Sequence, residues 1–296
     1  MDYLKYTIVP LEEDDEVEEL VEKKLDEIDD EMVDLEDEIE EEELVFKIEN
    51  EDGEMIAGCI LDIDSWMIAD LDILWVDERY RKRGLGSALI RQAEKAAKER
   101  GCYLMTLGTF DFQAKPLYLK HGFSVCGTIP NWPTGHENYC MRKLLDEPSA
   151  DYVPTHDDSA EFVILEGTEE DAEFICKNLG SYNRVQVPSM NKPVSLSKKV
   201  LDEDGNPVGA IIAEVGDWKD GFVNMIWVDE PYRNQGIGSE LIAIVEREMK
   251  EQGATLVLAD PSDWQDAIFR KNGYTVCSTQ EDCPKGHLEF VMYKDL

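Results

Sequence analysis

The chain has 296 residues, and its 66 acidic against 29 basic side chains give a formal net charge of −37. A field of that sign repels nucleic acid and anionic lipid and concentrates cations, so we expect no nucleic-acid partner; the acidity itself fits either a cationic substrate or a surface made for solubility. The seven cysteines are scattered and include no C-x-x-C pair, which predicts reduced thiols and no metal site. The sequence has no apolar run of about 18 residues and no signal-peptide pattern, which predicts a cytoplasmic protein without a membrane span.

The first 54 residues combine a strand with a strongly acidic amphipathic region. Residues 3–9 predict a strand. Apolar side chains then recur every three or four residues, which predicts one or two helices with an acidic outer face. These side chains are Val17, Leu20, Val21, Leu25 (or Lys24), Ile28, Met32, Leu35 and Ile39. The charge run therefore indicates a solvated helix face, and Glu51–Glu54 after it is a hairpin signal between two strands.

The elements that follow are a strand, a glycine-bearing turn and a helix. The strand is predicted over 70–76, and the helix runs from about 84 to 100, with its apolar side chains on one face and Gly101 at its end. A strand at 104–109, a short helix containing Tyr118 and a last pair of strands complete the first half.

The second half repeats the first. The run Trp75–Ser87 returns as Trp227–Ser239, and the hairpin signal returns at 203–206. A repeat of this length indicates a duplicated domain rather than a solenoid unit. We therefore predict two tandem α/β domains, each with a mixed, mostly antiparallel sheet flanked by helices. The expected limits are 1–146 for the first domain, 147–161 for a polar linker and 162–296 for the second domain.

The glycine-bearing turn is a candidate anion site. In Arg81-x-x-Gly84-x-Gly86 the backbone can approach a phosphate because no Cβ intervenes, and the following helix adds partial positive charge at its N-terminus. Arg79, Lys82 and Arg83 lie beside Arg81, and this basic cluster in an acidic protein favours a multiply phosphorylated cofactor. Neither the dinucleotide fingerprint nor a Walker phosphate loop matches the turn.

Both copies of the turn, each after a strand that ends in an aliphatic residue, resemble the signature of the GCN5-related N-acetyltransferase (GNAT) superfamily. The segment Phe112–Phe123 is similar to a later block of that family, in which an aromatic residue stands shortly before Gly-Phe. The resemblance implies a splayed pair of strands that binds acetyl-CoA, with its pyrophosphate on the turn amides and its pantetheine on the strand end. The implied cofactor-binding residues are Leu74, Trp75, Val76, Arg81, Lys82, Arg83, Gly84, Leu85, Gly86, Ser87, Ile226, Trp227, Val228, Arg233, Asn234, Gln235, Gly236, Ile237, Gly238 and Ser239.

Acetyl transfer to an amine needs a group that accepts the amine proton and is helped by a group that protonates the departing thiolate. The resemblance assigns the acid to Tyr118, which could instead be a core aromatic residue. Asp72, which shares a face of the strand with Val76, is the expected base; Asp70 is the alternative, and either could be a solvated strand-end carboxylate.

The second half departs from this pattern at both positions. Phe269 stands in the place of Tyr118 and cannot donate a proton, and Asn224 stands in the place of Asp72 and cannot accept one. We therefore predict a catalytic first domain and a second domain that binds CoA without turnover or serves as a scaffold.

Two further features bear on the acceptor site. One stretch of the GNAT fold closes over the acceptor, and it corresponds to Asp29–Asp34 in the first half and to Ser181–Pro188 in the second. Each segment is expected to lie at the pocket of its own domain. The alternative is that each is only a loop and a helix end. His136 and His287 lie in matched Pro-x-Gly-His turns, where a local hydrogen-bonding role competes with a functional one.

The leading hypothesis is acetyl-CoA-dependent N-acetylation of a primary amine of a small molecule or peptide. A cationic acceptor is one of the two explanations of the acidic composition, and a surface made for solubility is the other. The alternatives are a non-catalytic acyl-CoA-binding or regulatory protein and an acidic interaction scaffold that uses helices within 11–43. Proteins of this family often pair, so we expect a monomer with an internal pair of domains, or a homodimer.

Overall fold

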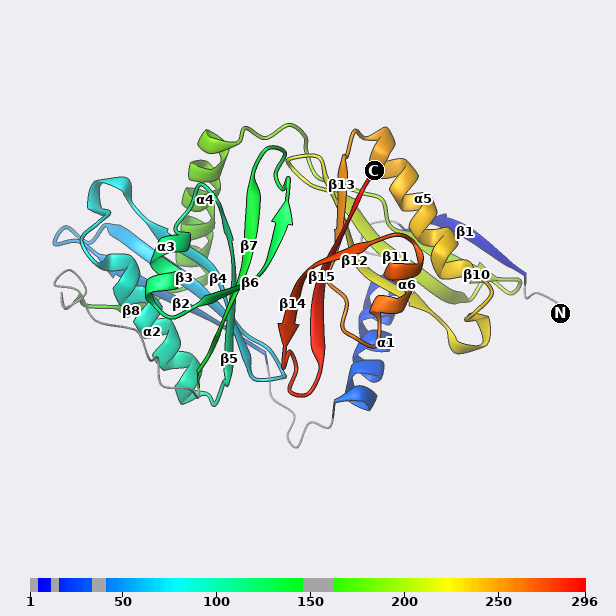
Figure 1. Ribbon diagram of the computed structural model, residues 1–296, viewed down its shortest axis with the longest axis horizontal. Helices are drawn as coiled ribbons and strands as arrows, with labels where there is room; N and C mark the ends of the chain where they lie inside the picture. The colour runs from blue at the N-terminus through cyan, green and yellow to red at the C-terminus, as the bar shows by residue number, and fades with distance from the viewer. Residues whose placement is uncertain (1–4, 12–15, 34–40, 146–161) are drawn as a thin grey trace.

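The computed structural model describes residues 5–11, 16–33, 41–145 and 162–296 (Figure 1). The predicted linker at 147–161 and the apolar positions Leu35 and Ile39 lie outside these residues. None of the described helices is long and apolar enough to cross a membrane.

The first half contains, in chain order, β1 (Tyr6–Pro10), α1 (Glu16–Met32), β2 (Glu42–Glu49), β3 (Met55–Ile63), β4 (Ile68–Val76), the 3-10 helix η1 (Glu78–Tyr80), α2 (Leu85–Glu99), β5 (Leu104–Phe110), α3 (Lys115–Lys120), β6 (Ser124–Pro130) and β7 (Glu137–Leu144). The second half contains β8 (Leu165–Glu166), α4 (Glu169–Gln186), β9 (Val194–Ser195), β10 (Lys198–Asp202), β11 (Pro207–Val215), β12 (Asp220–Val228), η3 (Glu230–Tyr232), α5 (Ile237–Glu251), β13 (Leu256–Ala259), α6 (Asp266–Lys271), β14 (Thr275–Glu281) and β15 (Leu288–Asp295). The α/β class with a mixed sheet is confirmed.

One sheet runs through both halves in the order β1-β10-β11-β12-β13-β15-β14-β6-β7-β5-β4-β3-β2-β8, and β9 pairs with β11. The halves join where Ser278 of β14 pairs with Gly127 of β6. A Cβ on Gly127 would lie 2.2 Å from the Cβ of Ser278, so this approach requires glycine. Across the same junction Trp132 Nε1 donates a hydrogen bond to Asp220 Oδ2 at 2.7 Å.

Each half opens its sheet at the same place. The parallel pairing of β4 with β5 ends at Asp70 and Thr106, and the parallel pairing of β12 with β13 ends at Phe222 and Leu258. The neighbouring pairs β3–β4 and β11–β12 carry register shifts close by, and such shifts bend a strand. The carboxyl-terminal part of β4, and likewise that of β12, is therefore left without a partner on one side.

The first strand and helix of each half pack on the other half. β1 pairs with β10, and α1 covers β11 and β12, with Val17 and Val21 buried against Trp227. Conversely, β8 pairs with β2, and α4 covers β2 to β4, with Ile175 buried against Trp75. Figure 1 shows this exchange, with α1 beside β11 and β12 and α4 beside β3 and β4. The core of each half thus contains a strand or helix that comes from the other half of the chain.

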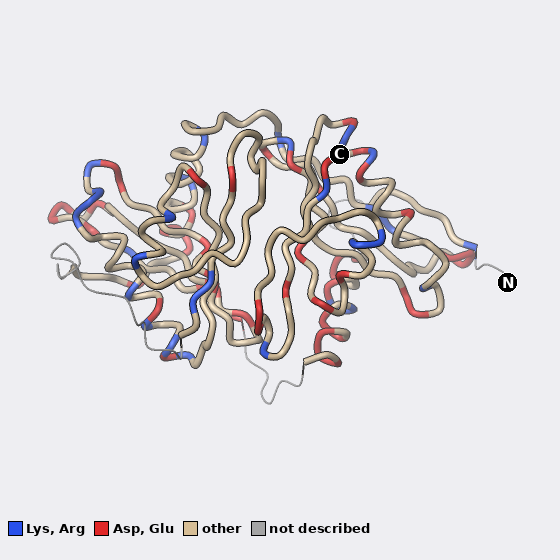
Figure 2. The backbone as a smooth tube through the Cα atoms, in the orientation of Figure 1, with Lys and Arg blue, Asp and Glu red and all other residues tan. Residues whose placement is uncertain are grey.

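The amphipathic pattern of the acidic region is confirmed over α1. Val17 and Val21 face the core, whereas acidic side chains follow one another along the solvent side of the helix (Figure 2). Since this helix lies on the second half, its nine acidic side chains are placed on the second half of the molecule.

Candidate functional site

The opening beside β4 forms a cavity of about 890 Å³, the first cavity. It is lined by the predicted residues Asp72, Leu74, Trp75, Val76, Arg81, Lys82, Gly84, Leu85, Gly86, Ser87 and Tyr118, together with Asp70. Arg83 is not among the lining residues, because its guanidinium donates to the carbonyl of Arg79 and lies over the Tyr80 ring.

The glycine-bearing turn has the backbone that an anion site needs. Gly84 takes a φ of 89° directly before α2, a conformation that glycine adopts without cost. The first turn of α2 leaves N–H groups without intrahelical acceptors, and these belong to Leu85, Gly86 and Ser87 at the cavity wall. A Cβ on Gly86 would lie 3.1 Å from Cδ2 of Leu117, so the narrow space also favours glycine. These residues fit a phosphate group.

Arg81 holds the strand end to the turn and does not point freely into the cavity. Its Nε donates to the carbonyl of Val76 at 3.1 Å, and its guanidinium lies 4.6 Å from the centroid of the Tyr182 ring. Lys82 also lines the cavity. The positive charge closest to a bound phosphate would therefore come from Lys82 and the helix end, with Arg81 fixing the shape of the turn.

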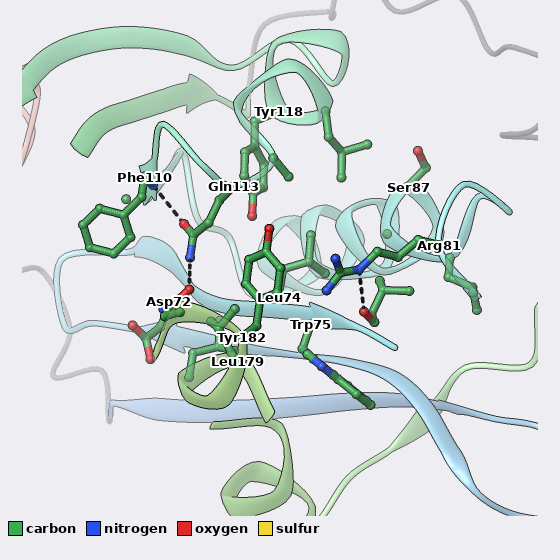
Figure 3. A pocket seen from close by; sticks show the side chains of 18 of the residues that line it. Asp72, Leu74, Trp75, Arg81, Ser87, Phe110, Gln113, Tyr118, Leu179 and Tyr182 are labelled. Carbon is green, nitrogen blue, oxygen red and sulfur yellow. Dashed lines mark hydrogen bonds between the residues drawn. The ribbon is translucent and has the colours of Figure 1, made fainter. Parts of the chain in front are cut away.

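Tyr118 enters the cavity from α3. Figure 3 shows Tyr118 and Tyr182 extending toward the middle of the cavity from opposite walls. Tyr118 is 7% exposed, and its ring packs edge-on against Phe123. Burial raises the pKa of the Tyr118 phenol, so the phenol stays protonated at neutral pH and can donate a proton or a hydrogen bond.

Asp70 and Asp72 face the cavity from β4. Partial burial raises the pKa of Asp72, and no described residue donates a hydrogen bond to its carboxylate. Burial raises the pKa of Asp70 to about 6, although the Thr106 hydroxyl donates a hydrogen bond of 2.5 Å that lowers it. Asp72 is thus open to a ligand, whereas Asp70 is held by a protein partner.

Sequence reasoning missed the wall that α4 supplies. Leu179, Tyr182 and Asn183 line the first cavity. Gln113 Nε2 donates to Asn183 Oδ1 at 2.9 Å (Figure 3), and Tyr182 Oη donates to the carbonyl of Phe112 at 3.0 Å. The expectation that Ser181–Pro188 closes the pocket of its own half is therefore wrong for this part of the segment, because α4 packs on the opposite half.

The corresponding opening beside β12 forms the second cavity, of about 470 Å³. The predicted residues that line it are Ile226, Trp227, Val228, Arg233, Asn234, Gly236, Ile237, Gly238 and Ser239, and Phe269 and Asn224 line it as well. Gln235 is not among the lining residues.

The turn at the second cavity has the geometry of the first. Gly236 has a φ of 95°, and Arg233 Nε donates to the carbonyl of Val228 at 2.8 Å. The opposite wall comes from α1, through Leu25 and Ile28. Asp29 accepts a hydrogen bond of 3.0 Å from Trp264 Nε1, and Trp264 lines this cavity, so the expectation that the Asp29 stretch closes the first pocket is wrong.

The two histidines have local partners. His136 Nδ1 lies 2.9 Å from Asp111 Oδ1, and His287 Nδ1 lies 3.2 Å from Asp263 Oδ1. Neither histidine lines either cavity. Within the described ranges, no cluster of three His, Cys, Asp or Glu side chains could hold a metal ion.

Comparison with known proteins agrees with this geometry. The model of the acetyltransferase (GNAT) family matches residues 9–123 and 154–274. Blasticidin-S acetyltransferase of Streptomyces morookaense is 38% identical over 96 residues, which cover 32% of this chain and 70% of that protein.

Two solved structures are similar over about half of the chain. An acetyltransferase from Bacillus cereus ATCC 14579 shares 32% identity over 45% of this chain and 96% of its own, with a TM-score of 0.42. A streptothricin acetyltransferase from Bacillus anthracis, solved with acetyl coenzyme A, shares 18% identity over 46% of this chain and 79% of its own, with a TM-score of 0.32.

Proposed function

The chain belongs to the acetyltransferase (GNAT) family, and from this premise we propose that its first cavity transfers the acetyl group of acetyl-CoA to a primary amine of a small molecule or peptide. The observation that carries the proposal is the meeting of three groups in one cavity: the glycine-bearing turn, the Tyr118 phenol and the open Asp72 carboxylate. Acetyl-CoA supplies an activated acetyl thioester.

The proposed roles follow from the state of each residue. The turn from Arg81 to Ser87 binds the pyrophosphate, and Leu74–Val76, which lacks a strand partner on the cavity side, offers backbone groups to the pantetheine. Asp72 accepts the ammonium proton of the amine, and Asp70 is the alternative acceptor. Tyr118 donates a proton or a hydrogen bond to the thiolate as it leaves.

The acceptor is proposed to be cationic. Asp70 and Asp72 place two carboxylates in the cavity, and the aromatic rings of Phe110 and Tyr182 add surfaces on which a cation is stabilised. The relative named for blasticidin S supports a small-molecule acceptor. We also propose that each linear half, 1–146 and 162–296, forms one acetyltransferase domain completed by the exchanged segment of the other, and that the protein is a monomer.

The test couples binding to turnover. Isothermal titration with acetyl-CoA measures affinity and stoichiometry, and release of free thiol is followed with spermidine, an aminoglycoside and a lysine-containing peptide. We expect turnover with at least one amine, and we expect Asp72→Asn to lower the turnover of the first cavity by about 100-fold. Asp204→Asn, which removes an equal charge from an exposed hairpin, is the matched control.

Two outcomes contradict the proposal. Binding of acetyl-CoA without thiol release from any amine supports a non-catalytic role for the first cavity. An elution mass near twice 33.8 kDa in gel filtration contradicts the monomer.

A further inference from the structure

The second cavity contains a carboxylate that the comparison of the two repeats does not predict. Asp260 directly follows β13 and lines this cavity together with Asn224. Its counterpart in the repeat is Gly108, which lies within β5 and lines the first cavity. In the second cavity, an acidic side chain therefore stands where the first cavity has a glycine, on the strand next to the one that carries Asn224.

The sheet register places the two positions across from each other. In the second half, the last parallel pair of β12 and β13 is Phe222 with Leu258, and two residues further along these strands stand Asn224 and Asp260. In the first half, the last pair is Asp70 with Thr106, and two residues further stand Asp72 and Gly108. Each cavity thus has one carboxylate at this level, on β4 in the first and after β13 in the second.

Asp260 is available to a ligand. It is exposed toward the cavity, and no described residue donates a hydrogen bond to its carboxylate. The surrounding protein excludes enough water to raise the pKa of Asp260 to about 6, so the carboxylate is ionised at neutral pH and has a higher affinity for a proton than an ordinary aspartate.

The rest of the second cavity keeps the features that bind a phosphorylated cofactor. Gly236 and Gly238 repeat the turn, and a Cβ on Gly238 would lie 3.2 Å from Cδ1 of Ile268, much as Gly86 faces Leu117 in the first cavity. The first turn of α5 presents its N–H groups at the same place. Two groups of the first cavity are absent: Phe269 stands on α6 where Tyr118 stands on α3, and Asn234 stands in the turn where Lys82 stands in the first.

We propose that the second cavity is a second acetyl-transfer site, in which Asp260 accepts the ammonium proton of the amine. This inference rests on the function proposed for the first cavity and extends it. The amine nitrogen forms a bond to the acetyl carbonyl carbon, and the carbon–sulfur bond breaks. One proton of the ammonium group goes to Asp260, a second proton of the same nitrogen goes to the thiolate, and the products are the amide and free CoA thiol.

The test removes the first site from the full-length protein. The triple variant Tyr118→Phe/Asp70→Asn/Asp72→Asn, the silenced variant, removes the proposed acid and both candidate bases from the first cavity, and the thiol release that remains is the proposed second activity. Adding Asp260→Asn to this background is expected to lower the remaining kcat by about 100-fold. Asp204→Asn in the same background is expected to leave it unchanged, because that carboxylate lies in an exposed hairpin.

A rescue variant separates chemistry from folding. Asn224→Asp, added to the silenced background with Asp260→Asn, moves the carboxylate to the wall that it occupies in the first cavity and is expected to restore at least about a tenth of the lost kcat. Isothermal titration of all variants with acetyl-CoA should give two sites per chain, which shows that the second cavity is still folded.

The possible failures are distinguishable. A wild-type protein that turns over no amine contradicts the function proposed for the first cavity and this inference together. An active wild type contradicts this inference alone if the silenced variant releases no thiol, if Asp260→Asn leaves its thiol release unchanged, or if acetyl-CoA titrates to one site per chain.

Discussion

Single residues decide the difference between the two cavities. The residue-by-residue comparison of the repeats identifies Tyr118 against Phe269 and Asp72 against Asn224, and the structure places all four at cavity walls. The same comparison overlooks Asp260, because an aspartate that replaces a glycine has no evident function in the sequence, and only the fold places it at the cavity that Asn224 also lines. The matched positions identify what the second cavity lacks, whereas the base that we propose for it lies after β13, next to β12.

The phenol of Tyr118 provides the first prediction at this scale. Tyr118→Phe removes the proton donor and keeps the buried ring, so the kcat of the first cavity, measured in a protein that carries Asp260→Asn, is expected to fall by about 100-fold while the KM for acetyl-CoA stays within about twofold. Steady-state kinetics with the best amine of the panel measures both constants. Unchanged activity in Tyr118→Phe, together with increased activity in Phe269→Tyr, would show that the acid role is assigned to the wrong half.

The carboxylates of β4 provide a second prediction, on pH. A carboxylate accepts a proton only when ionised, and burial raises the pKa of Asp72 and brings that of Asp70 to about 6. We therefore expect kcat/KM to decrease at a pH above the ordinary aspartate value of about 4, and through about 6 where Asp70 is the base. A pH–rate profile of a protein that carries Asp260→Asn measures this limb for the first cavity alone, and its loss on adding Asp72→Asn or Asp70→Asn identifies the base. A profile that stays flat down to pH 5 would contradict the role of both.

At the scale of elements, α4 is both a structural and a functional part of the opposite half. Ile175 is fully buried against β3, where a Cβ on Gly58 would lie 2.4 Å from its Cδ1. Lys47 of β2 forms an ion pair with Asp171 at 3.0 Å and fixes the start of the helix. Because Tyr182 and Asn183 lie at the other end of α4, this packing positions one wall of the first cavity.

The packing of α4 predicts a coupled effect. Ile175→Ala should lower the free energy of unfolding by about 2–5 kcal/mol, because it opens a cavity in a well-packed core. It should also raise the KM for the amine more than the KM for acetyl-CoA, since α4 contributes Tyr182 and Asn183 but none of the turn. Denaturant titration and steady-state kinetics measure the two effects. Val185→Ala, on the exposed side of the same helix at 79% exposure, is the control and should change neither.

At the scale of the whole molecule, the two halves are tied together by reciprocal exchange as well as by the β14–β6 junction. The strand and helix at 6–32 belong to the second core, and those at 165–186 belong to the first. The two halves of the sheet join through Gly127 and Ser278, and Tyr103 Oη donates to the carbonyl of Asp282 across the same boundary at 2.9 Å. Neither core is complete without the other half of the chain.

The exchange predicts the result of cutting the chain between its halves. A protease site inserted within 147–161 yields two fragments on cleavage, and these should remain associated and active because each still holds a strand and a helix on the other. Size-exclusion chromatography and thiol-release assays before and after cleavage measure the outcome. Fragments that separate without denaturant would mean that the exchanged contacts contribute little to stability.

The sequence by itself determined the local features of this protein. Apolar periodicity predicted α1, α2 and α5, and the glycine-bearing turns predicted the place of both cavities, because these signals depend on residues close together in the chain. Only the tertiary structure decided which half receives α1 and which receives α4. The two halves of the sheet come from one duplicated sequence and present similar surfaces to an amphipathic helix. Which half each helix covers therefore depends on long-range packing, such as that of Ile175 on Gly58 and of Val21 beside Trp227. The same long-range register places Asp260 and Asn224 at one cavity, and no local pattern in the sequence encodes that arrangement.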